Sequence, residues 1–165
     1  MAASRRWRLA GRWGALVTQG RWVDVPARGT LAAASVSHAV VAEAKTAYLA
    51  GHNTWGQLGQ GRTSVWGTAR IALPDRIVSA AAGLGFTCLA TSDALYVSGT
   101  NVRGQMGLDQ ERGSLSFQRL ALPAVRSVCA GLDHMLVLAG AQVWACGLHT
   151  DRQLGVPSRA PYLAT

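Results

Sequence analysis

The sequence predicts an all-β fold built from tandem copies of one small antiparallel sheet. The glycine-rich stretch that begins at Gly51 returns at Gly99 and again at Gly147, 48 residues apart both times. An aromatic residue stands three positions before each of these glycines. Short apolar runs alternate with turn residues between the copies. A fixed offset of this length, combined with such alternation, is typical of hairpins in series.

Bulk composition agrees with a sheet-rich fold. The chain has 165 residues, of which 49% are hydrophobic and only 15% are charged, and 19 of them are glycines. This combination favours strands and tight turns over exposed helices. No apolar run approaches the roughly 20 residues that cross a bilayer, so we expect no membrane span.

The three cysteines, Cys88, Cys129 and Cys146, form no Cys-x-x-Cys pair. An odd number at these spacings fits neither a disulfide framework nor a zinc site. Cys88 and Cys129 lie inside apolar runs, where we expect buried, reduced thiols that pack as small hydrophobes. This predicts a reducing compartment, or at least a fold that does not rely on disulfides.

Residues 1–34 differ in composition from residues 35–165. They contain six Arg and a single acid, Asp24, although the whole chain has 16 Lys and Arg against 8 acids. An Arg-rich, acid-poor N-terminus is typical of a mitochondrial transit peptide. We therefore expect a basic leader over 1–34 and a mitochondrial location; a disordered basic arm on a cytoplasmic or nuclear protein is the alternative. The charge is not spread evenly over the chain, as it would be in a uniformly basic nucleic-acid binder.

Three repeat units follow the leader, at about residues 35–76, 77–124 and 125–165. The clearest part of a unit is the stretch Gly-x-Asn-x-x-Gly-Gln-Leu-Gly. Upstream of this stretch lies an Ala-Gly pair, and a Phe or His stands three residues after the glycine of that pair. Several features that share one offset are hard to obtain by chance. The residues that we expect to define the structure of the repeat are Gly51, Asn53, Gly56, Gln57, Gly59, Gly83, Gly99, Asn101, Gly104, Gln105, Gly107, Gly131, His134, Gly147, Gln153 and Gly155.

Each unit contains short apolar runs that suit the strands of successive hairpins. The predicted strands are 77–82, 86–90 and 95–97 in the second unit and 125–130, 134–138 and 143–145 in the third. The segments 60–76 and 108–124 complete the units. Each of these segments carries a Leu-Pro pair near its end, where the next strand begins and a missing ladder donor is tolerated.

The Gly-x-Asn-x-x-Gly-Gln-Leu-Gly stretch predicts a tight turn. Its glycines permit positive φ or a close backbone approach, and its Asn side chain is able to bond the local backbone. We expect the Gln side chain to bridge backbone groups, because an amide both donates and accepts. The apolar residues Leu58, Met106 and Leu154 are predicted to lie between neighbouring units.

These motifs, with the aromatic residue before them, resemble the repeat of the regulator of chromosome condensation family over about residues 35–157. The resemblance implies blades of four strands that build seven-bladed propellers. Three units therefore imply an incomplete β-propeller, and we expect the chain to be a fragment or short product of a longer repeat protein. The third unit departs from the family pattern at His149, where Asn is expected, and at Arg152, where Gly is expected, which leaves the geometry of its turn open.

No residue pattern predicts a catalytic, cofactor-binding or metal site. His38 and His134 share one repeat position, which Phe86 fills in the second unit, so we expect packed structural histidines. The glycine stretches lack the following helix that a dinucleotide site requires. Trp55 and Trp66 interleave with arginines as in single-stranded nucleic-acid sites, but packing between units is the favoured interpretation.

The sequence therefore predicts a non-enzymatic interaction module with a protein partner. The resemblance implies a small GTPase as one such partner, on which the chain would act as a guanine nucleotide exchange factor-like protein without a catalytic side chain of its own. The alternative is a mitochondrial RNA- or ribosome-associated factor, which the basic leader and the Trp and Arg content motivate.

Overall fold

The computed structural model describes residues 7–9, 23–25, 31–110, 112–122, 124–155 and 162–163. These residues form three four-stranded sheets, which we call blades, and one two-stranded sheet, with no helix among them. Blade 1 consists of β3 (Leu31–Ala34), β4 (His38–Glu43), β5 (Thr46–Asn53) and β6 (Ser64–Ala72). Blade 2 consists of β7 (Ser79–Ala82), β8 (Phe86–Ala90), β9 (Ala94–Gly99) and β10 (Ser114–Ala121). Blade 3 consists of β11 (Val125–Ala130), β12 (His134–Ala139), β13 (Gln142–Leu148) and β14 (Tyr162–Leu163). The separate small sheet consists of β1 (Trp7–Leu9) and β2 (Val23–Val25).

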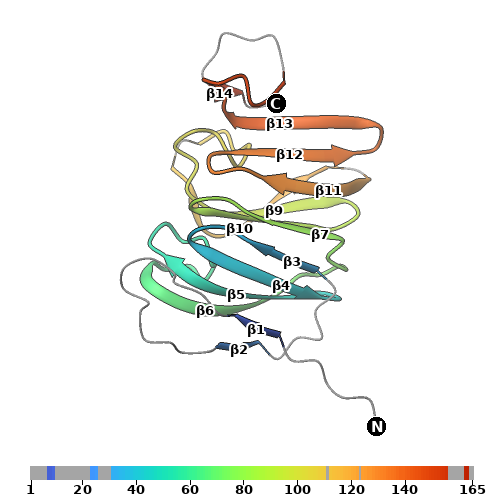
Figure 1. The fold of residues 1–165 in the computed structure, drawn as a ribbon. Coiled ribbons are helices and arrows are strands. Elements are labelled where there is room, and N and C mark those ends of the chain that lie inside the picture. The colour runs from blue at the N-terminus through green and yellow to red at the C-terminus, as the bar shows by residue number, and fades with distance from the viewer. Residues whose placement is uncertain are drawn as a thin grey trace.

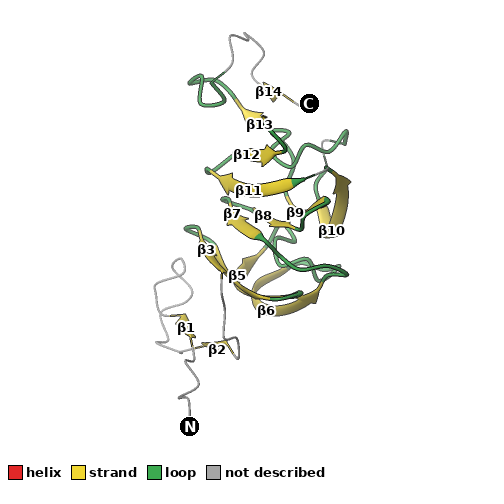
Figure 2. Cartoon of the chain, turned by 90° about the vertical axis from the view of Figure 1, so that its right-hand side faces the viewer, coloured by secondary structure: helices red, strands yellow, loops and turns green. Residues whose placement is uncertain are grey.

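Every blade is a simple antiparallel meander, in which strands that follow one another along the chain also pair in the sheet. The three blades stack face to face in chain order (Figure 1). Their first strands, β3, β7 and β11, lie side by side along one edge of the stack (Figure 2). This is the arrangement of propeller blades, whose first strands are the inner ones, and it confirms the predicted all-β fold of tandem antiparallel blades.

The third strands extend beyond their predicted bounds, to Ala94–Gly99 in blade 2 and Gln142–Leu148 in blade 3, and two strand starts also differ from those predicted. The first blade begins at Leu31, inside the segment assigned to the leader, because the run from Leu31 to Ala34 pairs with β4 as an inner strand. The inner strand of blade 2 begins at Ser79 rather than at residue 77. Of the remaining leader residues only β1 and β2 are described, and the predicted transit peptide therefore lies largely outside the described residues.

The hydrophobic core lies between the blades rather than within them. Val40, Leu49 and Leu58 of blade 1 pack with Leu89 and Tyr96 of blade 2 in one buried cluster. Blade 2 is therefore covered on both faces, because its opposite face packs on blade 3. All residues of β8 and β9 are buried as a consequence, and these strands read as continuous apolar runs rather than as an alternating pattern.

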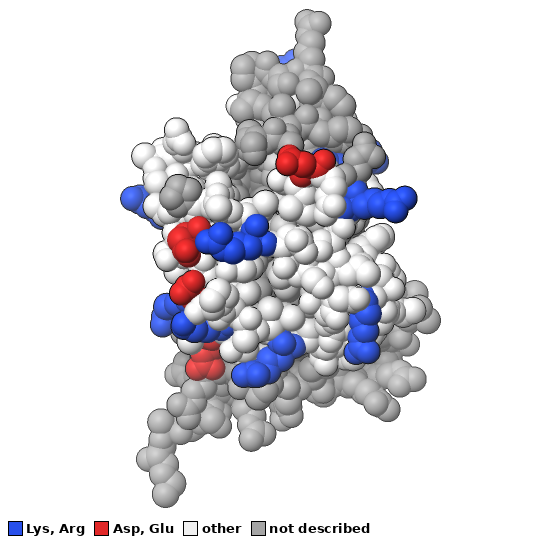
Figure 3. Space-filling model, turned by 180° about the vertical axis from the view of Figure 1, so that it is seen from behind, with Lys and Arg blue, Asp and Glu red and all other residues white. Residues whose placement is uncertain are grey.

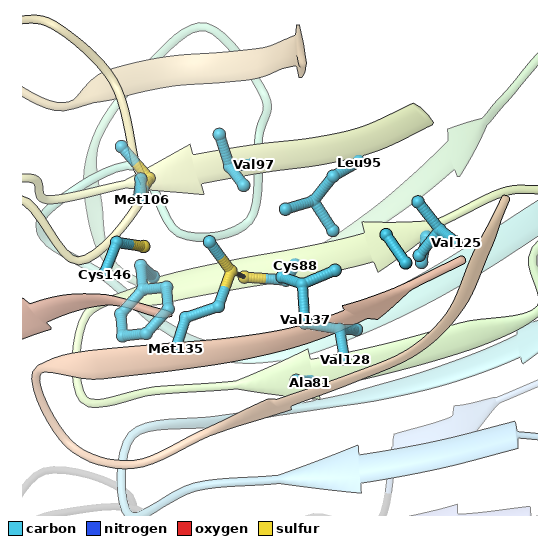
Figure 4. Close-up of a cluster of buried hydrophobic side chains, with 13 residues drawn as sticks. Ala81, Cys88, Leu95, Val97, Met106, Val125, Val128, Met135, Val137 and Cys146 are labelled. Atoms are coloured by element: carbon cyan, nitrogen blue, oxygen red, sulfur yellow. Dashed lines mark hydrogen bonds between the residues drawn. The ribbon is translucent and has the colours of Figure 1, made fainter. Parts of the chain in front are cut away.

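The second core cluster joins blade 2 to blade 3 (Figure 4). Cys88, Leu95 and Met106 meet Met135 and Val137 there, and the Cys88 Sγ lies 3.2 Å from the Met135 Sδ. Burial of this kind contributes about 25 cal/mol per Å² of apolar surface. Both clusters contain the residue that follows the motif Gln, so Leu58 and Met106 lie between blades as predicted.

Two of the three thiols are buried, as expected. Burial raises the pKa of the Cys88 thiol well above its usual range and that of the Cys146 thiol to about 12, so both are held protonated. The prediction of a buried Cys129 is wrong, because this thiol is exposed. Cys129 pairs with Leu136 across β11 and β12 and faces the side of blade 3 that points away from blade 2.

Candidate protein-interaction face

Two loops of every blade lie at the same end of the stack, because neighbouring strands run in opposite directions. One is the short loop between the first and second strands. The other is the corner loop after the third strand, which contains the Gly-x-Asn-x-x-Gly-Gln-Leu-Gly motif. We call this end of the stack the loop face; the corner loops lie toward the left in Figure 1. Its short loops are 35–37, 83–85 and 131–133, and its corner loops begin at residues 54, 100 and 149.

The first motif glycine occupies the same environment in all three blades. Gly51, Gly99 and Gly147 have φ angles of 136°, 119° and 108°. A Cβ atom there would lie 2.1 to 2.5 Å from a carbonyl oxygen of the short loop, which belongs to Ser37, Gly85 and Asp133 respectively. A residue with a side chain is therefore excluded by backbone geometry and by contact, so only glycine brings the two loops together at these positions.

A side-chain acceptor closes each corner loop. The Oδ1 atoms of Asn53 and Asn101 accept the N–H of the residue five positions later, at 3.0 and 2.8 Å. In blade 3 the Nδ1 atom of His149 accepts the N–H of Leu154 at 3.3 Å. The imidazole nitrogen thus replaces the Asn oxygen, and the turn is retained although the residue differs.

The motif Gln braces the start of the same loop. Its Oε1 accepts the backbone N–H two residues earlier, at 3.1 Å for Gln57, 2.8 Å for Gln105 and 2.8 Å for Gln153. Arg152 stands at the glycine position of blade 3 and adopts a φ of 58°, close to the 80° of Gly56. The departures at His149 and Arg152 therefore leave the third turn with the geometry of the other two.

The corner of blade 1 is also bonded to the next blade. The Thr87 hydroxyl on β8 donates to the Gln57 carbonyl at 2.6 Å, and the Ser98 hydroxyl on β9 donates to the Gly56 carbonyl at 2.7 Å. The corresponding contact of blade 2 is a weaker one, from the Cys146 thiol to the Gln105 carbonyl at 3.5 Å. The corner loops of blades 1 and 2 are therefore fixed both by their own blade and by the next one.

His38 is a buried structural histidine. Its Nε2 lies 2.6 Å from the Thr87 Oγ1 and its Nδ1 lies 2.9 Å from the Ser37 Oγ. Because the Thr87 hydroxyl donates to the Gln57 carbonyl, its oxygen accepts from His38, which therefore donates from Nε2. Burial lowers the pKa of His38 from 6.5 to about 4, since the charged form would lose its hydration.

His134 occupies the same repeat position in blade 3. Its ring lies over Gly131, where a Cβ would meet the imidazole at 2.1 Å, as the ring of Phe86 lies over Gly83. The glycine before each ring is therefore required by close packing. No three His, Cys, Asp or Glu side chains among the described residues form a group that would hold a metal ion.

The motif residues are largely internal, but the loops that they hold carry exposed apolar side chains. Val36, Trp55, Val102 and Leu132 are 67%, 46%, 64% and 57% exposed. They come from all three blades. Single exposed apolar residues are ordinary, whereas several on one face indicate a binding surface.

We did not predict these exposed residues as a site. Val36 and Leu132 stand at one repeat position, shared with Leu84, which is the first variable residue after the Ala-Gly pair of the motif. The apolar residue that all three copies carry at this loop position is the sequence signal that would have predicted Val36 and Leu132 as site residues. Trp55 was considered only for its proximity to arginines in the sequence, and its ring lies against Gly85 of the next blade.

The stacked meanders and their fixed corner loops define an all-β protein with a propeller-like repeat fold. The chain is similar to the solved crystal structure of human WBSCR16, with a TM-score of 0.69 and 21% sequence identity. The likeness covers 84% of this chain and 40% of that one, so the chain spans less than half of the length of this neighbour. No protein-family model matches the chain, and no curated protein matches it. Among the described residues, no helix is long and apolar enough to cross a membrane.

Proposed function

We propose that the chain is a protein-interaction module that binds its partner through the loop face. The observation that carries this proposal is the contrast at that face between buried motif residues and the exposed Val36, Trp55, Val102 and Leu132. Loops held by a rigid scaffold are the usual place for binding residues. Apolar side chains on a fixed backbone lose little conformational entropy on binding, which favours recognition of a folded protein surface.

We further propose a small GTPase as the partner, with the chain acting as an exchange factor-like protein. This step rests on the resemblance of the repeat to the regulator of chromosome condensation family. Exchange proceeds by binding the nucleotide-free GTPase, so no catalytic side chain is required. A fold whose candidate site consists of packed loops and exposed apolar residues is consistent with such a role.

A panel of purified small GTPases loaded with fluorescent GDP tests this proposal. We expect the chain to accelerate GDP release from one member, and the double substitution Val36→Asp and Leu132→Asp to abolish the acceleration. Val78→Asp is the matched control, because Val78 is 36% exposed and directly precedes β7, at the end of the stack opposite the loop face. Unchanged GDP release across the panel would contradict the exchange proposal. If the chain binds a GTPase without accelerating GDP release, the interaction module is supported and the exchange activity is contradicted.

An RNA-associated function receives less support from the described surface. In Figure 3 the Lys and Arg residues are separated by uncharged surface and interspersed with acids. Arg119, for example, lies 3.4 Å from Asp93 in an exposed ion pair. Nucleic-acid binders gather their cations along a path that follows the phosphates. The mitochondrial location stays a prediction from residues 1–34.

A further inference from the structure

The outermost strand of blade 1 has one edge that pairs with no other strand among the described residues. This strand, β6, spans 9 residues and is the longest of the described strands, and it pairs only with β5. It lies on the side of the stack away from β3 (Figure 2). A further blade at either end of the stack would cover a face of this sheet but not this edge. The exposure of the edge is therefore a property of blade 1 itself.

The register of β5 and β6 shows which backbone groups of β6 point outward. The Leu73 N–H donates to the Lys45 carbonyl at 2.8 Å, so these two residues form a hydrogen-bonded pair. Hydrogen-bonded and non-hydrogen-bonded pairs alternate along an antiparallel ladder. Thr68, Arg70 and Ala72 belong to the non-hydrogen-bonded pairs, so their N–H and C=O groups point away from β5. One further strand would complete this half of a ladder.

A side chain of blade 1 already uses one group of this edge. The Gln60 Nε2 donates to the Thr68 carbonyl at 2.7 Å, which agrees with a carbonyl that points away from β5. This hydrogen bond is exposed to solvent. Exchange of one amide donor for another at an exposed carbonyl changes the free energy little. The backbone N–H of an incoming strand is therefore able to replace the Gln60 amide.

The outer strand of blade 2 is protected in ways that β6 is not. β10 shifts its register against β9 between Ser114 and Gln118, and the Phe117 ring occupies the place where a Cβ of Gly59 would stand. Irregular pairing, proline and lysine are devices that keep an edge from pairing with another chain. β6 keeps one register with β5 from residue 67 to residue 72 and contains neither proline nor lysine. Its edge is therefore a template for an added strand.

The side chains at this edge indicate the chemistry of the added strand. Residues 54–74 contain two arginines, Arg62 and Arg70, and no acid, and both arginines are exposed. Val65 and Trp66, near the start of β6, are 56% and 38% exposed. An extended segment with acidic and apolar residues complements these side chains. A second copy of β6 does not, because it would bring further arginines and no acid to the edge, and like charges opposite each other destabilise a sheet.

We propose that the edge of β6 is a second interaction site, which takes an acidic, extended segment of a protein partner as a fifth strand of blade 1. Backbone hydrogen bonds to residues 68, 70 and 72 hold the segment, and Arg70 with the apolar pair Val65 and Trp66 selects its side chains. The site is distinct from the loop face, because it uses the side of blade 1 rather than the ends of its strands.

Fluorescence anisotropy with labelled peptides of about eight residues tests the site on the full chain. Val and Thr alternate in these peptides, and either Glu or Lys replaces two of the Thr residues. We expect saturable binding of the Glu peptides and binding of the Lys peptides that is weaker by about tenfold. N-methylation of one set of alternate backbone amides should abolish binding, whereas N-methylation of the other set should not, because only one edge of the peptide faces β6.

Two substitutions locate the site. Arg70→Glu should reverse the preference from Glu peptides to Lys peptides. Arg126→Glu makes the same change of charge at an exposed residue of β11 and should leave the preference as it is. The absence of saturable binding of any Glu peptide would overturn the proposal. So would equal sensitivity to N-methylation of the two sets, or an Arg70→Glu variant that still prefers Glu.

The edge and the loop face are tested separately. The double substitution Val36→Asp and Leu132→Asp alters the loop face and should leave peptide binding unchanged, while Arg70→Glu should leave GDP release from the GTPase unchanged. Far-ultraviolet circular dichroism verifies that each variant is folded. Failure of the peptide experiment therefore refutes the edge site alone. Peptide binding that is lost in the loop-face variant, although this variant is folded, would also overturn the assignment to β6.

Discussion

A few side-chain atoms decide the geometry of every corner loop. Asn53 and Asn101 supply an oxygen to a backbone N–H that would otherwise be buried without a partner, and His149 supplies a nitrogen to the same end. A buried donor left unmatched costs about 1–3 kcal/mol. The position therefore demands an acceptor at a fixed place rather than one residue type. This explains how the third motif departs from the pattern while its turn does not.

The neutral state of His38 makes stability depend on pH. The folded-state pKa is about 4 and the unfolded value is 6.5, so the unfolded chain binds the proton first as the pH falls. The contribution of neutral His38 to the free energy of unfolding is complete above pH 6.5 and is lost as the pH falls from 6.5 to 4. We expect the free energy of unfolding, measured with urea at each pH, to fall by about 3 kcal/mol across this window.

The substitution His38→Phe provides the control, because Phe86 fills the equivalent position of blade 2. The aromatic ring keeps the packing and removes the titration. The variant should therefore show a smaller loss of stability between pH 6.5 and pH 4 than the parent. Equal losses in the two proteins would show that His38 does not cause the effect.

The strands could be predicted to the extent that both of their faces are buried. Strands β8 and β9 lie between two blades and stand out as apolar runs. The predicted bounds of β8 agree with the structure, whereas β9 was predicted at 95–97 and extends from Ala94 to Gly99. Strands β6 and β10 are outer strands with mostly exposed or half-exposed side chains, so no apolar run marks them. Their existence follows from pairing with β5 and β9, which is a non-local property that the local pattern does not contain.

The corner loop of blade 3 contains a residue with a strained backbone, Arg152, and substitution of this residue tests whether the corner loops of the repeats are equivalent. Arg152 has a φ of 58°, where a side chain costs roughly 1–2 kcal/mol. Arg152→Gly should relieve this strain. Glycine also gains more entropy on unfolding, which offsets part of the benefit. We expect a net rise of about 0.5–1 kcal/mol in the free energy of unfolding, measured by urea titration.

The reciprocal change in blade 2 is the matched experiment. Gly104 has a φ of 68°, and a Cβ there would meet nothing within 4 Å, so only backbone strain opposes a side chain. Gly104→Arg should lower the free energy of unfolding by a similar amount. Opposite signs for the two substitutions are required; two destabilised variants would mean that the two turns are not equivalent.

At the scale of the whole molecule, the structure is an open stack in which the middle blade is the best buried. The 48-residue offset predicted the blades, their order and the glycine corners. It did not predict the loop face, because exposure depends on which loop residues the neighbouring blade covers. Nor did it predict the exposed side of blade 3 that points away from blade 2, since Val40 and Cys88, the equivalents of Leu136, are fully buried. Both surfaces follow from stacking, which a single unit does not encode.

The central claim is that the three blades share one register, and nuclear magnetic resonance tests it most directly. The first motif glycine pairs with the first residue of the second strand in each blade: Gly51 with His38, Gly99 with Phe86 and Gly147 with His134. We expect cross-strand nuclear Overhauser effects between these residues in all three pairs, at matching intensity. Contacts present in one pair and absent from the other two, or helical sequential contacts through these segments, would contradict the repeat and the fold drawn from it.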